Sequence, residues 1–187
     1  PCPALFTDRD KTKRSQKKFG FFQTEKEIFK EVASQLDLTT VSAFVSGRHP
    51  LAFLVEAADD ICYSIMDLED GFRLGLLSFK ETESLLLPLI HKRDLSGYKK
   101  RDDNEKVGYL RAKAISDLVN LVADAFMDNE KNILAGNFNK ELVTVISKSR
   151  ALKKIEKVSI TKIYRHRSVV EREVVGETRQ WPYHKKM

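Results

Sequence analysis

The feature that most constrains the fold is one long segment, residues 48–71, with the sequence RHPLAFLVEAADDICYSIMDLEDG. Pro50 suits the first turn of a helix and Gly71 suits its end, so the segment predicts a helix of about five turns. It carries five acids near its centre and end: Asp59, Asp60, Asp67, Glu69 and Asp70. Burying carboxylates costs free energy unless a cation meets them, so these acids must face water, a metal or a basic partner.

Three of the polar positions form a row, because residues four apart lie on one face of a helix. Asp59, Tyr63 and Asp67 make this acidic stripe, and Glu56 and Asp70 flank it. Apolar residues cover much of the remaining circumference: Leu51, Leu54, Val55, Ala58, Ile61, Cys62, Ile65 and Leu68. A helix so widely apolar is typically central, so we expect the stripe to face an internal cleft. Such a cleft could hold a divalent cation and a hydroxylated ligand, and the alternative is a narrow solvated edge. The geometry alone leaves both open.

The rest of the chain predicts an all-α fold. Thr24 and Glu27 have the spacing of a capping box, and no run of strand period is present. Further helices are expected over 25–36, 79–92, 105–128, 139–149 and 157–175. Pro88 should kink or shorten the 79–92 helix. Residues 1–23 are expected to form a basic N-terminal loop, and the polar segment 92–105 another loop.

Composition excludes some classes of protein. The 187 residues are 42% hydrophobic and 32% charged, which is ordinary for a soluble globular chain with one sizeable core. No run approaches the ~18 apolar residues of a membrane span. Cys2 and Cys62 make neither a disulfide framework nor a CxxC metal site, which fits a reducing cytoplasm. The chain begins at Pro1 rather than Met, and we expect it to be a fragment of a longer protein.

The net charge of +6 is concentrated in two clusters, which would attract phosphate-bearing partners, nucleotide or nucleic acid. The first lies within residues 11–18. The second comprises Lys148, Arg150, Lys153, Lys154, Lys157, Lys162, Arg165, Arg167 and Arg172. The alternative interpretation of such clusters is a solvated helix face.

The segment HPLAFLVEAADDICYSIMDLEDG resembles the second conserved segment of the deoxyguanosine triphosphate triphosphohydrolases (dGTPases) of the HD-domain superfamily. Three other stretches agree with that family in order: KKFGFFQTEKEIFKEVA (17–33), ILAGNF (133–138) and IYRHRSVVEREVVG (163–176). The resemblance covers roughly residues 15–176. It implies a multi-helix, HD-domain-like bundle in which residues 24–176 are the helical dGTPase-like region and residues 177–187 a divergent tail.

The resemblance also implies roles for individual residues. The family holds a divalent metal, such as Mg²⁺ or Mn²⁺, with a His, a His-Asp doublet and a distant Asp, which falls on Asp59. Tyr63 and Asp67 resemble the residues that contact the deoxyribose. Asp67 would accept from the 3′-hydroxyl, and Tyr63 would pack where a ribose 2′-hydroxyl would lie. Lys18 and Phe19 resemble a phosphate-contacting pair of a lysine and an aromatic residue.

The chain departs from the family pattern in its metal ligands. It contains no His-Asp dipeptide, and its four histidines (His49, His91, His166 and His184) lack metal-ligand spacing. His49 precedes the long helix and is expected to cap it or pack against it. The chain therefore supplies one metal ligand of four and resembles the C-terminal part of such an enzyme. Alone it is expected to be inactive and to hold no metal.

The family cleaves a deoxynucleoside triphosphate (dNTP) at the α-phosphorus and releases the deoxynucleoside and tripolyphosphate. The first hypothesis is therefore the C-terminal part of a metal-dependent hydrolase of dGTP or another dNTP, expected to form homo-oligomers and not to bind membranes. The alternative is a non-enzymatic helical module that binds nucleic acid or a partner subunit through the basic segment 148–172. Hydrolysis and salt-sensitive nucleic-acid binding distinguish the two.

Overall fold

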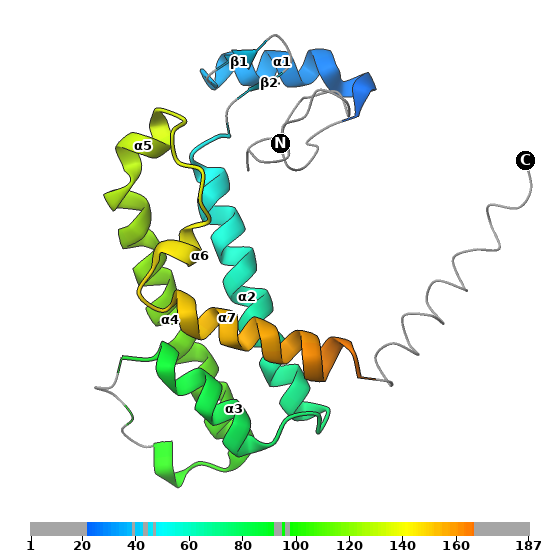
Figure 1. The fold of residues 1–187 in the computed structure, drawn as a ribbon, viewed down its shortest axis with the longest axis vertical. Helices are drawn as coiled ribbons and strands as arrows, with labels where there is room; N and C mark the ends of the chain where they lie inside the picture. The colour runs from blue at the N-terminus through cyan, green and yellow to red at the C-terminus, as the bar shows by residue number, and fades with distance from the viewer. Residues whose placement is uncertain are drawn as a thin grey trace, which may run out of the picture. The chain divides into compact units, whose positions relative to one another are not determined.

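The computed structural model describes residues 22–38, 40–42, 45–46, 48–91, 95 and 98–166. Helices dominate the described residues, which confirms the all-α prediction (Figure 1). One short antiparallel pair of strands, β1 (Thr40–Ser42) and β2 (Val45–Ser46), was not predicted. It is too short to show a strand period in the sequence.

The described helices and helical turns follow one another along the chain (Figure 1). They are the 3₁₀ turn η2 (Gln23–Glu25), α1 (Lys26–Gln35), α2 (Leu51–Arg73), α3 (Phe79–Leu86), the 3₁₀ turns η3 (Leu87–Leu89) and η4 (Tyr98–Lys100), α4 (Asp103–Asp128), α5 (Glu130–Leu134), α6 (Leu142–Val145), α7 (Ser149–Val158) and the π-helix η5 (Ser159–Tyr164). None of the described helices combines the length and apolar character that a membrane span requires.

Several predicted helices are confirmed, with small changes at their ends. Helices α1, α2 and α4 lie where periodicity placed them, and α3 gives way at Leu87 to a 3₁₀ turn that contains Pro88. The predicted capping box at Thr24 is wrong, because Thr24 lies inside η2. The capping bond at this end runs from the Phe22 amide to the Glu25 carboxylate, at 2.9 Å.

The boundaries predicted between residues 139 and 175 are wrong. The helix expected over 139–149 is a single turn, α6, and residues 150–156 belong to α7. The dense basic side chains obscured a helical period beneath them, since Leu152 and Ile155 are buried three residues apart. Residues 167–175 of the last predicted helix, residues 1–21 of the N-terminal loop and the tail 177–187 lie outside the described residues.

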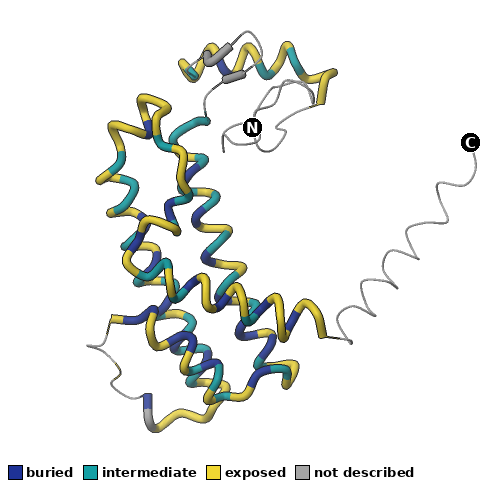
Figure 2. Tube along the Cα trace, viewed as in Figure 1, coloured by how far each residue is buried: buried dark blue, intermediate teal, exposed yellow. Residues whose placement is uncertain are grey.

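The chain divides into two compact units. The first comprises Pro1–Ala58 and Leu121–Ile146, and the second Asp59–Asn120 and Ser147–Met187. In the described part of the second unit, buried apolar residues recur along the helices, and Figure 2 draws buried residues in dark blue. The largest fully buried side chains of this unit are Ile61, Ile65, Leu68, Leu86, Leu89, Leu110, Leu118 and Ile155. This unit carries the residues of the acidic stripe.

Candidate functional site

Helix α2 presents the acidic stripe, and a local bond marks where the helix begins. The Nδ1 atom of His49 accepts a hydrogen bond from the Leu51 amide at 3.2 Å, which confirms the capping role predicted for His49. The helix then continues without interruption through Asp59, Tyr63 and Asp67. Their spacing of four residues places these three side chains on one face, one turn apart.

The C-terminal end of α2 lies beyond the predicted stop. Gly75 has a φ of +70°, and its amide donates to the Phe72 carbonyl at 2.9 Å. The Leu76 amide donates to the Gly71 carbonyl at 2.8 Å, which completes a Schellman motif. The helix therefore runs through Gly71 and ends at Arg73, because Gly75 provides the left-handed residue that the motif requires.

The acidic stripe faces solvent. Asp59 is exposed, Tyr63 is 64% exposed and Asp67 is half-buried, so the predicted internal cleft is wrong for the described residues. The inference failed because α2 is not covered all round. Leu51 and Val55, which were predicted to be buried, are 56% and 69% exposed. Asp59 has no hydrogen-bond or ion-pair partner among the residues that the structure describes, which leaves its carboxylate available to a ligand.

Glu69 is the one buried acid of α2 within the described residues. Its Oε2 atom lies 2.6 Å from Nη1 of Arg111 on α4, and its Oε1 atom lies 2.8 Å from Nη2 of Arg73. Two guanidinium groups therefore offset the desolvation of this carboxylate. Glu69 joins α2 to α4 and has no free oxygen for a ligand.

Asp67 makes a different contact, with a residue 97 positions later. The hydroxyl of Tyr164, the last residue of η5, donates a hydrogen bond to Oδ2 of Asp67. Burial, and then this hydrogen bond, raise the pKa of Tyr164 to about 12, so the phenol is neutral at physiological pH. The bond brings a second tyrosine to the acidic stripe, close enough to Tyr63 for the two to interact electrostatically.

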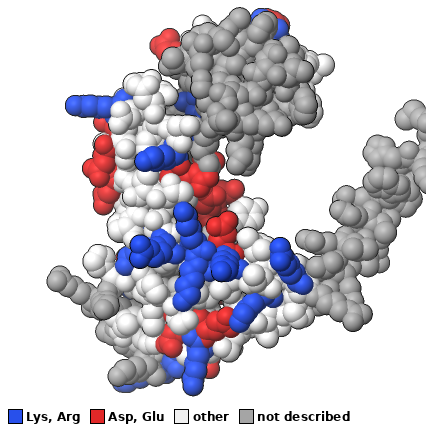
Figure 3. All heavy atoms as spheres, in the orientation of Figure 1, with Lys and Arg blue, Asp and Glu red and all other residues white. Residues whose placement is uncertain are grey.

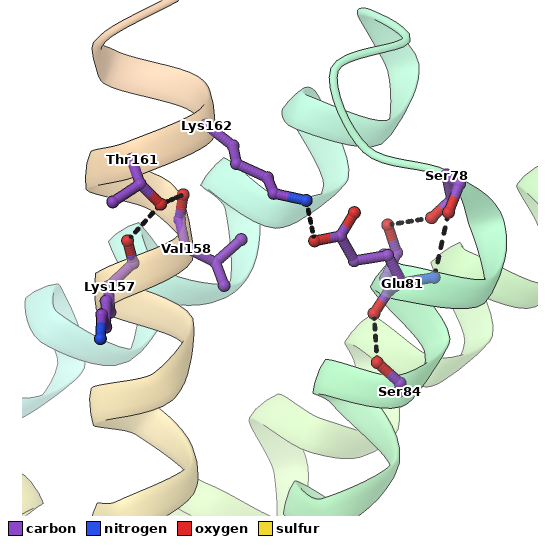
Figure 4. A network of polar contacts seen from close by, with 8 residues as sticks. Ser78, Glu81, Ser84, Lys157, Val158, Thr161 and Lys162 are labelled. Atoms are coloured by element: carbon purple, nitrogen blue, oxygen red, sulfur yellow. Dashed lines mark hydrogen bonds and ion pairs between the residues drawn. The ribbon is translucent and has the colours of Figure 1, made fainter.

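The π-helix that carries Tyr164 is held on two sides. Lys162 donates to Oε1 of Glu81 on α3 at 2.6 Å, as Figure 4 shows. The Thr161 hydroxyl donates to the carbonyls of Lys157 and Val158, at 2.8 and 3.2 Å (Figure 4). The two Thr161 bonds provide a donor to backbone carbonyls at the point where α7 changes to the wider π-helix.

On the other side, the buried side chain of Ile163 packs directly against Gly71 of α2. A Cβ atom at Gly71 would lie 2.7 Å from Cδ1 of Ile163, so this approach depends on a glycine. The contact places Tyr164, the next residue, beside Asp67, one turn back along α2.

The solvent face of α7 is strongly basic. Arg150, Lys153, Lys154 and Lys157 are exposed, and none of them has an ion-pair partner among the described residues. Their spacing puts them on one side of the helix, and Figure 3 shows blue side chains gathered there. Glu156 is the one acid of α7. The second predicted basic cluster is therefore real as far as residue 165, and Lys162 within it is already paired with Glu81.

Two curated relatives establish the ancestry of the chain. It is 45% identical over 165 residues to a deoxyguanosinetriphosphate triphosphohydrolase-like protein of Synechocystis sp., covering 87% of this chain and 37% of that protein. It is 40% identical over 130 residues to a protein of the same description from Pseudomonas aeruginosa, covering 67% of this chain and 29% of that protein. The matched part of the chain belongs to the dGTPase-like family. No family model matches the chain.

The relationship extends more distantly to a protein described as a dGTPase without qualification. The deoxyguanosinetriphosphate triphosphohydrolase of Salmonella paratyphi A is 28% identical over 178 residues, covering 86% of this chain and 34% of that enzyme. The chain thus spans 29% to 37% of the length of these three dGTPase-like relatives. Most of each relative has no counterpart in this chain.

The described residues do not form a complete site for the metal that the dGTPase family implies. No group of three His, Cys, Asp or Glu side chains within them is arranged to hold a metal ion. Asp59 offers one carboxylate on an exposed helix face, and one carboxylate does not bind a divalent cation firmly. The role of Asp59 as a metal ligand stays a prediction for a longer dGTPase.

The structure brings together some of the residues predicted for the dGTPase-like site. Asp59, Tyr63 and Asp67 share one face of α2, whereas Lys18 and Phe19 lie outside the described residues. Tyr164 was missed as a member of this cluster. It lies in the stretch IYRHRSVVEREVVG, but the only signal that links it to Asp67 is the tertiary contact.

Proposed function

We propose that this chain is part of a metal-dependent dNTP triphosphohydrolase, with dGTP or a related deoxynucleoside triphosphate as its substrate. The complete enzyme would release the deoxynucleoside and tripolyphosphate. The observation that carries the proposal is the acidic stripe, exposed on α2 of a chain whose relatives are dGTPase-like proteins. The predicted homo-oligomer and cytoplasmic location belong to the same proposal.

Each residue of the acidic stripe has a separate task in this proposal. Asp59 would contribute one oxygen ligand to a divalent metal such as Mg²⁺ or Mn²⁺, with the other ligands supplied from outside the described residues. Asp67 would accept a hydrogen bond from the 3′-hydroxyl of the deoxyribose, for which its Oδ1 atom is suited because Tyr164 occupies Oδ2. Tyr63, one turn from each, would pack against the sugar and exclude a 2′-hydroxyl.

The test measures kcat/KM for dGTP and GTP in a protein that joins this chain to the remaining length found in the relatives. Asp59→Ala should lower kcat by orders of magnitude, because it removes a ligand from the metal that activates water. Asp67→Ala should lower kcat/KM roughly ten- to a hundredfold, since it removes a hydrogen bond to a charged acceptor. Tyr63→Ala should let GTP compete better with dGTP.

The matched control is Asp124→Ala, because Asp124 is an exposed helical acid of α4 far from the stripe in sequence. Its kinetics should equal those of the unchanged protein. Equal losses from Asp59→Ala and Asp67→Ala, with an unchanged dGTP-to-GTP ratio in Tyr63→Ala, would mean that the stripe is a structural edge.

A second candidate function rests on the basic face of α7. Arg150, Lys153, Lys154 and Lys157 form a row of exposed cations without acidic partners among the described residues, which suits a run of phosphates better than a single one. In this alternative the chain binds nucleic acid through electrostatic contacts to the backbone. Such binding would not depend on Asp59 or Asp67.

A further inference from the structure

Tyr164 and Asp67 form a contact that the proposed function does not explain. Asp67 lies on α2 and Tyr164 ends η5, and the phenol donates to one of the two carboxylate oxygens. The neighbouring acid of α2 that is buried, Glu69, meets two arginines instead. Asp67 therefore receives a neutral donor, the phenol of Tyr164, in place of a cation.

The backbone around Tyr164 is built for this contact. The six-residue π-helix η5 continues α7, and such i→i+5 turns are rare and are frequently found at functional sites. A π-helix widens the turn and so changes the direction in which its last side chains point. Three consecutive residues then make contacts on different partners: Lys162 with Glu81, Ile163 with Gly71, and Tyr164 with Asp67.

This anchoring fixes the rotamer of Asp67. An aspartate on a helix face can rotate about both of its side-chain bonds, and its carboxylate is free to turn away from a ligand. A hydrogen bond from a tyrosine that is itself held in place restricts that rotation. A ligand that then binds Asp67 loses less side-chain entropy, which increases its affinity.

We propose that Tyr164 is a positioning residue of the sugar site: it holds Oδ2 of Asp67 so that Oδ1 stays directed toward the 3′-hydroxyl of a deoxynucleoside. The inference rests on the proposed function, because it assumes that Asp67 reads the sugar. It adds that recognition of the 3′-hydroxyl depends on a residue from the far end of the chain. Tyr164 itself need not touch the sugar.

The experiment compares two nucleosides that differ only at the 3′ position. Binding of 2′-deoxyguanosine and 2′,3′-dideoxyguanosine is followed by NMR titration in the protein that joins this chain to the remaining length found in its relatives. The titration is made on the unchanged protein and on Asp67→Asn, Tyr164→Phe and Tyr98→Phe. The unchanged protein should prefer 2′-deoxyguanosine about tenfold, the lower end expected for a half-exposed hydrogen bond to a charged acceptor. Asp67→Asn and Tyr164→Phe should both lose most of this preference.

Tyr98→Phe is the matched control. The Tyr98 hydroxyl also donates to a carboxylate, that of Glu83, but this bond joins η4 to α3 and involves no residue of the acidic stripe. Removing it should leave the preference unchanged. Tyr164 is 45% exposed and Phe keeps its ring, so Tyr164→Phe should fold, and its circular dichroism should match that of the unchanged chain.

The outcomes separate the two proposals. If Asp67→Asn loses the preference and Tyr164→Phe keeps it, Asp67 reads the sugar without help and the positioning role of Tyr164 is overturned, while the proposed function stands. If the unchanged protein binds neither nucleoside, or binds both equally, the sugar role of Asp67 is overturned and the positioning role with it. Loss of the preference in Tyr98→Phe as well would also overturn the positioning role, because the effect would not be specific to Tyr164.

Discussion

At the scale of single residues, Asp67 and Glu69 stand two positions apart on α2 and meet opposite kinds of partner. Glu69 is buried and its charge is balanced by the guanidinium groups of Arg73 and Arg111. Asp67 is half-buried and receives a neutral phenol from Tyr164. A carboxylate bound by two cations has a structural role, whereas a carboxylate bound by one neutral donor can still bind a hydroxyl or a cation.

The Tyr164 phenol predicts how stability changes at high pH. Burial, and then the hydrogen bond to Asp67, raise its pKa to about 12, with smaller contributions from Glu156 and Tyr63. The unfolded chain has an ordinary tyrosine pKa of about 10. Because the folded state binds this proton more tightly, the stabilisation is complete below about pH 10 and is lost as the pH rises through about 12.

The test compares the free energy of unfolding of the unchanged chain and Tyr164→Phe by urea titration between pH 8 and pH 12. The variant should be less stable at pH 8, and the difference should shrink between pH 10 and pH 12. Tyr63→Phe is the control, because the Tyr63 hydroxyl has no hydrogen-bond partner among the described residues, and its effect at pH 8 should be small. A difference for Tyr164→Phe that stays constant to pH 12 would contradict the prediction.

At the scale of secondary-structure elements, two glycines near the end of α2 have separate roles, whereas the sequence assigned the end of the helix to Gly71 alone. Gly75 ends the helix through its positive φ, and Gly71 lets η5 approach. A Cβ at Gly71 would lie 2.7 Å from Cδ1 of Ile163 and 3.1 Å from Cδ1 of Leu77. The position of η5, and therefore of Tyr164, depends on this missing methyl group.

Gly71→Ala and Gly108→Ala should therefore have opposite effects on stability. Both glycines lie inside helices, where alanine is favoured by about 0.5–1 kcal/mol. A Cβ at Gly108 meets nothing within 4 Å, so Gly108→Ala should raise the free energy of unfolding by about that amount. Gly71→Ala should lower it by about 1–2 kcal/mol, because the crowding at Ile163 exceeds the helical gain.

Urea unfolding of both variants beside the unchanged chain measures the two effects. Gly71→Ala should also shift the NMR signals of Tyr164, whereas Gly108→Ala should leave them in place. Stabilisation of equal size in the two variants would mean that Ile163 moves aside without cost, and that Gly71 does not position η5.

At the scale of the whole molecule, the acidic stripe and the basic face of α7 belong to the same compact unit, yet they support different functions. In the proposed function the stripe would offer one carboxylate to a metal and one to a hydroxyl, and no group of three His, Cys, Asp or Glu side chains in the described residues is arranged to hold a metal ion. In the second candidate function the α7 face would bind phosphates through its own exposed cations. The isolated chain is therefore expected to differ in function from a complete enzyme.

Two assays on the isolated chain test this expectation. Incubation with dGTP and Mg²⁺ or Mn²⁺ should release no deoxyguanosine, and release that Asp59→Ala abolishes would show that the chain completes its metal site by another route. Binding to single-stranded DNA is measured over a range of salt concentrations. Removing Lys153, Lys154 and Lys157 by alanine substitution should reduce the slope of log K against log salt by about 2 if the second candidate holds.

The control for the DNA assay is the removal of three exposed lysines elsewhere: Lys80, Lys131 and Lys140. It lowers the net charge by the same amount without changing α7. Equal effects of the two triple variants would mean that the DNA responds to net charge alone, and no detectable DNA binding would remove the second candidate.

The sequence alone was sufficient for features that depend on neighbours within a turn or two. The 3.6-residue period predicted α1, α2 and α4, Pro88 ended α3, His49 capped α2, and i,i+4 spacing placed the acidic stripe on one face. Local periodicity carried this information because helices form from contacts three and four residues apart. It failed over 139–158, where a high density of charge hid the buried positions of α7.

The tertiary structure alone decided which chemical surroundings each acid meets. The bond from Tyr164 to Asp67 spans 97 residues, and the ion pair between Arg111 and Glu69 spans 42. The i,i+4 pattern placed Asp67 in the acidic stripe, but it did not show that Glu69 is buried against two arginines or that Gly75 rather than Gly71 ends the helix. The exposure of the stripe was likewise undetermined, because the apolar width of a helix shows how much surface could be buried, and only the packed chain shows how much is.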